Sequence, residues 1–157
     1  LRPLDREFPE LIEAAAKLEG DFILDGELIA HAEGRKLGSA DLQKRIGKRR
    51  AVGDLFMETG EGADSVPLRY VAFDLLWADG EVLLDLPLAE RRARLERLPL
   101  GGIFSIINLL SADDARGVET HFEQAILDGH GGLIAKDPAS IYRPGTRGAD
   151  WIRLGGA

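Results

Sequence analysis

The stretch FILDGELIAH holds two carboxylates, Asp25 and Glu27, within an otherwise apolar run. Because successive side chains of a strand point to opposite faces, a strand here places both carboxylates on one face, about 7 Å apart. Two like charges at that spacing repel each other unless a positive charge or a hydrogen-bonding group lies near them. The pattern therefore predicts that a metal ion, a ligand hydroxyl or a basic side chain lies over this pair.

Three further side chains with chemical potential stand in apolar segments. Phe73 lies in YVAFDLLW, Lys136 ends the run GGLIAK, and Arg153 is the only charge on its face of DWIRLGG. Taken singly, each has a structural interpretation: core packing for Phe73, and a surface cation at a strand end for Lys136 and Arg153. Their order along the chain, together with the acidic pair, is what favours a functional interpretation.

The elements that must position these side chains alternate between helices and strands. Helical spacing of apolar residues occurs in EFPELIEAAAKL, in LPLAERRARLERL with Asp85 as a plausible cap, and in SADDARGVETHFEQAIL, where Ser111-x-x-Asp114 resembles a capping box. Strands are predicted at FILDGELIAH, LRYVAFDLLW, GIFSIINLL, GGLIAKD and DWIRL, with a hairpin turn at Asp79-Gly80. This mixture predicts an α+β architecture with mostly antiparallel sheet.

Composition narrows the class of protein. The 157 residues are 45% hydrophobic, enough for one sizeable core, and their net charge of −7 argues against strong nonspecific nucleic-acid binding by the whole surface. Two local basic runs, KRIGKRR and RRARLER, are exceptions, and a solvated helix face is the simpler interpretation of both. The absence of cysteine excludes disulfides and zinc–cysteine sites and is compatible with a reducing cytoplasm. No run approaches the roughly 18 apolar residues of a membrane span.

In their order and spacing, LDGEL, RYVAFDLLWADG and GGLIAKDPASIYRPGTRGADWIRL resemble the adenylation domain of an ATP-dependent DNA ligase, closest to small bacterial ligases and end-joining ligase modules. The resemblance implies an α+β nucleotidyltransferase (ATP-grasp-like) fold of mostly antiparallel sheets flanked by helices. It further implies that residues 1–157 are a partial, N-terminally incomplete adenylation domain without an OB-fold domain. The parent enzyme would use ATP and Mg²⁺, pass through lysyl-AMP and DNA-adenylate intermediates, and seal nicked duplex DNA in repair, replication or recombination, as a cytoplasmic monomer.

The resemblance also implies roles for the residues singled out above. Glu27 would contact the ribose or the metal, with Asp25 supporting that site, and Phe73 would stack on adenine. Lys136 and Arg153 would face the phosphates, and a stacked ring with cations around a triphosphate is a sensible electrostatic cradle. Candidate DNA contacts come from the first basic run, namely Lys44, Lys48, Arg49 and Arg50.

Three departures from the family pattern concern charged groups. The family's nucleophile lies in a Lys-x-Asp-Gly motif, and none of the five lysines of this chain is followed by x-Asp-Gly. Gly131 stands where a glutamate is usual, and Gly155 stands where the second cation of a Lys-x-Lys motif is usual. Because a phosphoramide cannot form without its lysine, we expect no catalytic nucleophile, no lysyl-adenylate and no nick sealing by this chain alone.

Two alternatives stay open on the sequence. One is a non-catalytic module that keeps the nucleotidyltransferase scaffold for weak nucleotide binding or as an interaction surface, which Gly131 and Gly155 favour. The other is an RNA ligase or capping-type enzyme with the same skeleton, which the long match around RYVAFDLLWADG and DPASIYRPGTRG makes less favourable.

Overall fold

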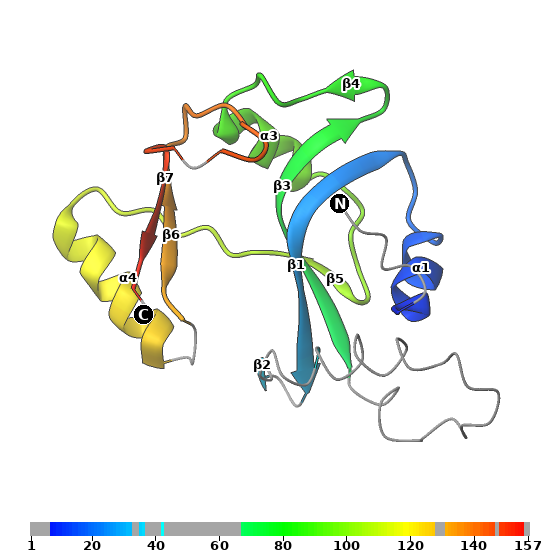
Figure 1. Cartoon of the computed structure of the whole chain (residues 1–157), viewed down its shortest axis with the longest axis horizontal. Helices are drawn as coiled ribbons and strands as arrows, with labels where there is room; N and C mark the ends of the chain where they lie inside the picture. The colour runs from blue at the N-terminus through cyan, green and yellow to red at the C-terminus, as the bar shows by residue number, and fades with distance from the viewer. Residues whose placement is uncertain are drawn as a thin grey trace. The chain divides into compact units, whose positions relative to one another are not determined.

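The structure, a computed structural model, describes residues 7–32, 35–36, 42, 67–127, 131–146 and 148–155 (Figure 1). The chain divides into two compact units. Unit 1 comprises Leu1–Gly20, Gly26–Phe73 and Leu98–Ile106, and unit 2 comprises Asp21–Asp25, Asp74–Arg97 and Ile107–Ala157. The two longest strands contribute residues to both units.

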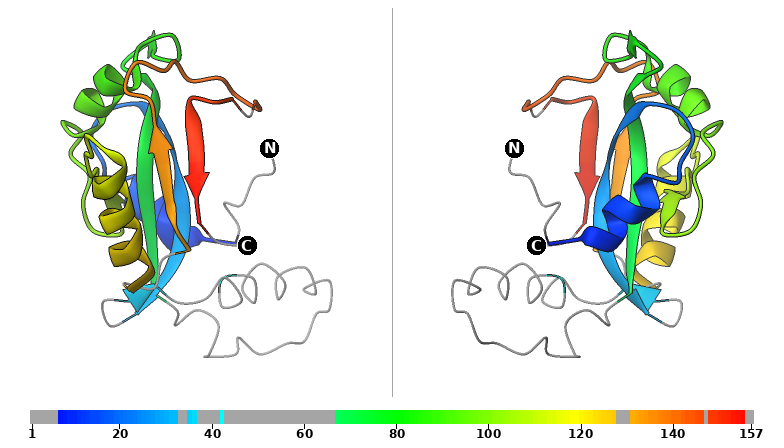
Figure 2. Two further views of the ribbon diagram at one scale, coloured as in Figure 1. Left: turned by 90° about the vertical axis from the view of Figure 1, so that its left-hand side faces the viewer. Right: turned by 90° about the vertical axis from the view of Figure 1, so that its right-hand side faces the viewer.

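That sheet is built around β1 (Phe22–Ala32) and β3 (Leu68–Ala78), which run side by side in Figure 2. Its order is β2-β1-β3-β4, and β5 also pairs with β3; the bounds are β2 (Arg35–Lys36), β4 (Glu81–Val82) and β5 (Phe104–Ile106). Strands β2 and β4 pair antiparallel with their neighbours, whereas β5 is parallel to β3. The predicted α+β architecture with mostly antiparallel sheet is confirmed.

The hairpin between β3 and β4 forms at the predicted position. Trp77 pairs with Val82 and Ala78 with Glu81, which leaves Asp79 and Gly80 as a two-residue loop. Both loop residues have positive φ angles, 49° and 89° respectively. This is the conformation of a type I′ turn, whose twist matches that of the flanking strands and which Asp-Gly sequences favour.

A close approach in unit 1 explains the glycine between the two acids of β1. A Cβ atom at Gly26 would lie 2.6 Å from Cζ of Tyr70 and 2.6 Å from the carbonyl oxygen of Val71. The Tyr70 ring is itself packed against Phe104, with ring centroids 5.9 Å apart. Glycine is therefore required here because a tyrosine ring and a strand backbone occupy the space of a side chain.

Three helices accompany the strands in the described part of the chain. α1 (Pro9–Ala15) belongs to unit 1 and ends earlier than its apolar spacing predicted, and the buried Phe8 precedes it. α3 (Leu88–Leu95) follows Pro87, which is its N-cap without a side-chain hydrogen bond, so the prediction that Asp85 caps this helix is wrong. α4 (Ala115–Leu127) begins after Asp114, whose carboxylate accepts a 2.8 Å hydrogen bond from the Gly117 N–H.

Unit 2 contains a separate two-stranded antiparallel ribbon, β6 (Leu133–Lys136) and β7 (Trp151–Leu154). Helix α4 lies beside this ribbon (Figure 1), and the ring of Phe122 reaches the end of β7 at Gly155. Most buried side chains of unit 2 come from β3, α3 and the segment between them; the full set among the described residues is Asp74, Leu75, Leu83, Leu88, Arg91, Leu95, Ala125 and Ser140. Two of these are charged, which bears directly on the site described next.

Candidate functional site

The ribbon β6–β7 brings two of the predicted cations to one face. Lys136 pairs with Trp151 and Ile134 pairs with Arg153, so these four side chains share a face, because directly opposite residues of a ladder point the same way. The ammonium Nζ of Lys136 lies 3.6 Å from the centre of the Trp151 ring. Arg153 is exposed on the same face. The sequence predicted both cations but not the ring on which Lys136 sits.

Asp25 has a hydrogen-bonding partner far away in the sequence. The hydroxyl of Tyr142 donates a 2.6 Å hydrogen bond to Oδ2 of Asp25, across 117 residues of chain. Burial raises the pKa of the Tyr142 phenol well above its ordinary value, and the hydrogen bond and charge of Asp25 raise it further. Tyr142 therefore remains a protonated donor throughout the neutral and moderately alkaline range.

Arg91 and Asp74 form a buried ion pair in unit 2. Nε of Arg91 donates to Oδ1 of Asp74 at 2.8 Å and Nη2 donates to Oδ2 at 2.9 Å, and both side chains are 0% exposed. Nη1 of Arg91 donates to the carbonyl oxygens of Leu86 and Ser140, at 2.5 and 3.1 Å. Arg91 thus ties α3 to β3 and to the segment that follows β6.

The interpretation of RRARLER as a solvated helix face is wrong for its first residue. Arg91 lies three residues after Leu88 and four before Leu95, and all three side chains are buried on the same side of α3. That spacing was the available signal, because an arginine within an apolar helical stripe requires a buried anion. Its partner, Asp74, interrupts the apolar run of β3 in the same manner.

Lys136 lies close to these charges. Burial lowers the pKa of its ammonium below the ordinary value of 10.5; the carboxylates of Asp74 and Asp25 oppose this effect, and the guanidinium groups of Arg91 and Arg92 add to it. The opposing charges allow a half-buried lysine to remain a cation near neutral pH. A site with a positioned ammonium of this kind is suited to binding an anionic ligand.

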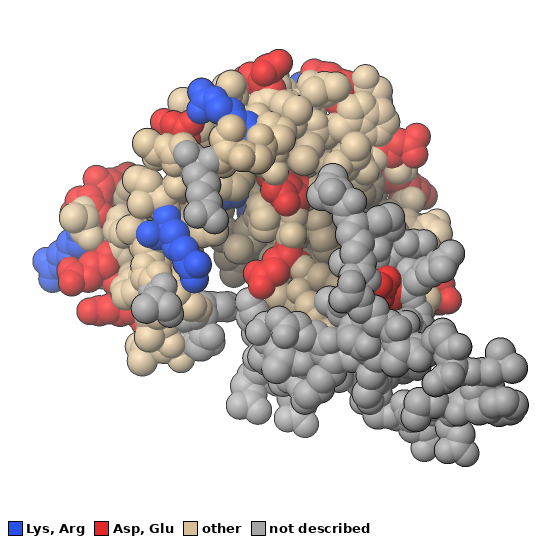
Figure 3. Space-filling model, viewed as in Figure 1, with Lys and Arg blue, Asp and Glu red and all other residues tan. Residues whose placement is uncertain are grey.

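The remaining predicted residues either belong to unit 1 or fall outside the described residues. Glu27 and Phe73 belong to unit 1, where Glu27 is exposed on β1 and Phe73 is half-buried on β3. The predicted DNA contacts Lys44, Lys48, Arg49 and Arg50 fall outside the described residues. On the face drawn in Figure 3, the described lysine and arginine side chains are scattered rather than gathered into one basic patch.

The two glycines that replace charged residues of the family motifs differ in their surroundings. A Cβ at Gly131 would meet nothing within 4 Å, so a larger residue fits there. At Gly155, where φ is +96°, a Cβ would lie 2.2 Å from Cε2 of Phe122. A side chain at position 155 therefore conflicts with the packing of α4 against the ribbon.

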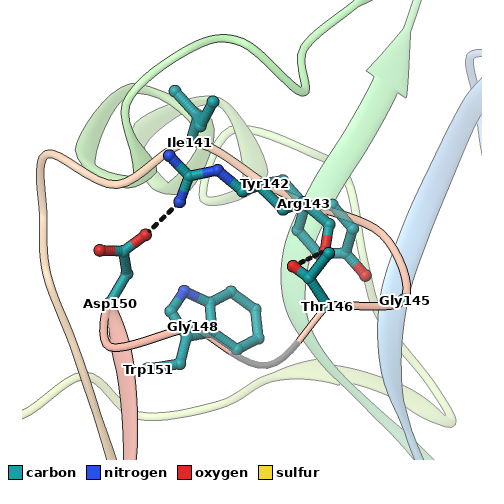
Figure 4. A pocket seen from close by; sticks show the side chains of 8 residues that line it. All are labelled: Ile141, Tyr142, Arg143, Gly145, Thr146, Gly148, Asp150 and Trp151. Atoms are coloured by element: carbon teal, nitrogen blue, oxygen red, sulfur yellow. Dashed lines mark hydrogen bonds and ion pairs between the residues drawn. The ribbon is translucent and has the colours of Figure 1, made fainter.

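A pocket of about 310 Å³ lies in the loop between β6 and β7 (Figure 4). An ion pair crosses it, in which Nη1 of Arg143 lies 2.5 Å from Oδ2 of Asp150, and Thr146 donates a hydrogen bond to the Arg143 carbonyl. The pocket is lined by Ile141, Tyr142, Arg143, Gly145, Thr146, Gly148, Asp150 and Trp151. Tyr142 and Trp151 thus contribute both to this pocket and to the surroundings of Lys136.

Two classes of feature are absent from the described residues. No group of three or more histidine, cysteine, aspartate or glutamate side chains there is placed to hold a metal ion. In that same part of the chain, no helix has the length and hydrophobicity needed to cross a membrane. A magnesium ion bound through one carboxylate and a ligand's phosphates would not need such a group.

Comparison with known proteins identifies the family. Residues 1–154 match the sequence profile described as ATP dependent DNA ligase domain. The chain is 40% identical over 183 aligned residues to a probable DNA ligase of Opitutus terrae, covering 98% of this chain and 17% of that protein. It is 38% identical to a probable DNA ligase of Streptomyces avermitilis, covering 93% of this chain and 28% of the relative. The chain therefore spans less than a third of the length of either relative.

Solved structures agree in fold and family. The ligase domain of LigD from M. tuberculosis superposes with a TM-score of 0.72 at 27% identity, over 98% of this chain and 44% of that one. A mycobacterial DNA ligase D complexed with ATP and MES gives a TM-score of 0.68, also at 27% identity, over 97% and 44% of the two chains. The profile match, the sequence relatives and these superpositions confirm the predicted resemblance, and the chain belongs to the ATP-dependent DNA ligase domain family.

Proposed function

We propose that this chain is the phosphate-binding part of the adenylation domain of an ATP-dependent DNA ligase. The observation that carries the proposal is the shared face of β6 and β7, on which Lys136 is seated over Trp151 and Arg153 is exposed two residues further along β7. Two cations on one strand ribbon match the charge of a triphosphate. The choice of ligand is supported by the similar structure of a mycobacterial DNA ligase D, which is complexed with ATP.

The other parts of the proposal follow the family. Phe73 would stack on the adenine, and Glu27 would contact the ribose or hold Mg²⁺ together with the phosphates. A bound Mg²⁺ would neutralise part of the triphosphate charge. The parent enzyme would act in the cytoplasm, as a monomer, on nicked duplex DNA, with Lys44, Lys48, Arg49 and Arg50 as candidate contacts to it. Without a lysine in the nucleophile motif, the chain as it stands would bind ATP without forming lysyl-AMP.

The proposal predicts that Lys136→Ala weakens ATP binding about 10- to 150-fold, because a hydrogen bond to a charged group contributes about 1.5–3 kcal/mol. Arg153→Ala has a smaller effect, since its side chain is exposed. Titration calorimetry with ATP measures both. Arg94→Ala is the matched control. It also removes one positive charge, but from an exposed pair between Arg94 of α3 and Glu81 of β4, and it should change the affinity less than twofold. Equal affinities for Lys136→Ala and Arg94→Ala would contradict the assignment.

The affinity for ATP should also depend on pH in a defined direction. The lowered pKa of Lys136 means that its ammonium loses its proton below the ordinary value of 10.5, so binding should weaken as the pH rises toward that value. The free energy of unfolding should change in the opposite direction. Between the lowered pKa of Lys136 and the ordinary value, the unfolded chain holds this proton more tightly than the folded chain, so the fold becomes more stable as the pH rises. ATP titrations between pH 7 and 10 test the first statement. The pH dependence should vanish in Lys136→Ala.

A further inference from the structure

Four side chains of unit 2 form a series in which two neighbouring aromatic rings lie between two cations. Nζ of Lys136 lies 3.6 Å from the Trp151 ring centre, and the rings of Trp151 and Tyr142 meet edge to face with centroids 5.8 Å apart. The guanidinium carbon of Arg91 lies 5.8 Å from the Tyr142 ring centre. Both cation distances fall within the range in which a ring attracts a positive charge.

A carboxylate anchors Tyr142 and another anchors Arg91, at the end of the series away from Lys136. Asp25 accepts the hydrogen bond of the Tyr142 hydroxyl, and Asp74 accepts two hydrogen bonds from Arg91. Tyr142 is therefore held at its hydroxyl by β1 and at its ring face by α3. Trp151 in turn packs edge to face against a ring that is itself fixed in position.

Such a series has a consequence for Lys136. A lysine side chain has four rotatable bonds and loses more conformational freedom than most when a ligand fixes it. A ring beneath the ammonium limits that freedom before the ligand arrives, so that less is lost on binding. The strength of phosphate binding then depends on residues that do not touch the phosphate.

We propose that Trp151 is the positioning residue of Lys136, and that the hydrogen bond between Tyr142 and Asp25 holds Trp151 in place. Asp25 then serves as a hydrogen-bond acceptor for Tyr142 rather than as part of a metal or ribose site. The inference deepens the proposed function and rests on it, since the benefit appears only if Lys136 binds phosphate. It assigns roles to Trp151 and Tyr142, and a different role to Asp25.

The position of Lys136 can be measured without any ligand. The ring current of an indole shifts the resonances of a side chain that lies over its face upfield, so the ε-methylene protons of Lys136 report the contact with Trp151 directly. We expect an upfield shift in the unaltered chain that disappears in Trp151→Leu and partly survives in Trp151→Phe, which keeps a ring. Lys136 resonances that are the same in all three proteins would overturn the proposal, whatever the ATP affinity.

ATP titrations then test whether this position matters for binding. Trp151→Leu should weaken the affinity about 2- to 30-fold, the range expected for loss of a cation–ring contact. In Lys136→Ala, the added Trp151→Leu change should have no further effect, because the two residues act through one contact. Full additivity of the two changes would overturn the positioning role. If neither single change alters the affinity while the Lys136 shift still depends on Trp151, the proposed phosphate site is wrong and the contact between the two residues stands.

Substitutions at Asp25 distinguish its role as a hydrogen-bond acceptor from the effect of its negative charge. Asp25→Asn keeps an oxygen that can accept the Tyr142 hydrogen bond and removes the charge, whereas Asp25→Ala removes both. We expect Asp25→Asn to retain ATP affinity within about twofold, and Asp25→Ala to resemble Tyr142→Phe. Arg143→Ala, next to Tyr142 in an exposed ion pair, controls for disturbance of the loop. A loss in Asp25→Asn as large as that in Asp25→Ala would show that the charge is what the site uses, and would overturn the inference for Asp25.

Discussion

Replacement of Arg91 by methionine should lower the free energy of unfolding by about 3–5 kcal/mol, because it leaves the carboxylate of Asp74 buried without a counter-charge. The change also removes the donors to the carbonyl oxygens of Leu86 and Ser140, the second of which joins α3 to the segment after β6. Small domains are stable by only about 5–15 kcal/mol, so this is a large share of the total. Denaturant unfolding followed by circular dichroism measures the difference.

Two further proteins make this measurement specific. Arg94 lies on the same helix as Arg91, and Arg94→Ala breaks an exposed pair with Glu81 of β4, which should cost less than about 1 kcal/mol. The double replacement of Arg91 by methionine and Asp74 by leucine should recover part of the loss, because no charge is then buried alone. Recovery stays incomplete, since the two carbonyl oxygens still lack their donor. A loss at Arg91 no larger than that at Arg94 would show that the buried pair does not stabilise the fold.

Replacement of Gly132 by alanine should be the second most damaging change, whereas the same replacement at its neighbour Gly131 should be nearly neutral. Gly132 has a φ of +133°, and a Cβ there would lie 2.2 Å from the carbonyl oxygen of Leu154 on β7. Backbone strain of about 1–3 kcal/mol adds to the displacement of the paired strand. A Cβ at Gly131 would meet nothing within 4 Å.

The adjacent glycines therefore form a matched pair, and thermal unfolding of the two alanine variants tests the contrast. Because the conflict at Gly132 lies at the start of the ribbon that carries Lys136, its alanine variant should also bind ATP more weakly. Similar thermal unfolding midpoints for the two variants would mean that β6 and β7 can separate at this end without loss of stability. Gly131→Glu, which restores the charge usual in the family, should be tolerated for the same steric reason as Gly131→Ala.

The parts of the fold that depend on local sequence were predicted. The Asp79-Gly80 hairpin was predicted from turn chemistry. A strand over Leu68–Trp77 was predicted from a run of strand-forming residues, and the observed strand β3 is one residue longer. The stretch GIFSIINLL was predicted as a strand over its whole length, but β5 is only Phe104–Ile106. The apolar residues that follow β5 in this stretch, Ile107, Leu109 and Leu110, are exposed, and apolar composition alone cannot tell a strand from an exposed segment without regular structure.

The sequence predicted which residues belong to the candidate site but not which side chains they contact. Lys136 and Arg153 were singled out from their position in apolar strands, and the register of β6 and β7 places them on one face. The opposition of Lys136 and Trp151 depends on that register, which no spacing within a single strand reveals. The partner of Asp25 was expected to be a cation, a metal or a ligand hydroxyl, and in the structure it receives a phenolic hydrogen bond from Tyr142. Contacts between residues so far apart in sequence are set by the tertiary fold.

The separation between Asp25 and Tyr142 also orders events during synthesis of the chain. Tyr142 leaves the ribosome 117 residues after Asp25, an interval of about 6 to 23 s at about 5–20 residues per second. All segments of unit 1 have been made once Ile106 is added, whereas unit 2 still lacks α4, β6, β7 and Tyr142. Translation therefore gives unit 1 time to fold before the ribbon exists, and we expect the surroundings of Lys136 to form only after β7 has been made.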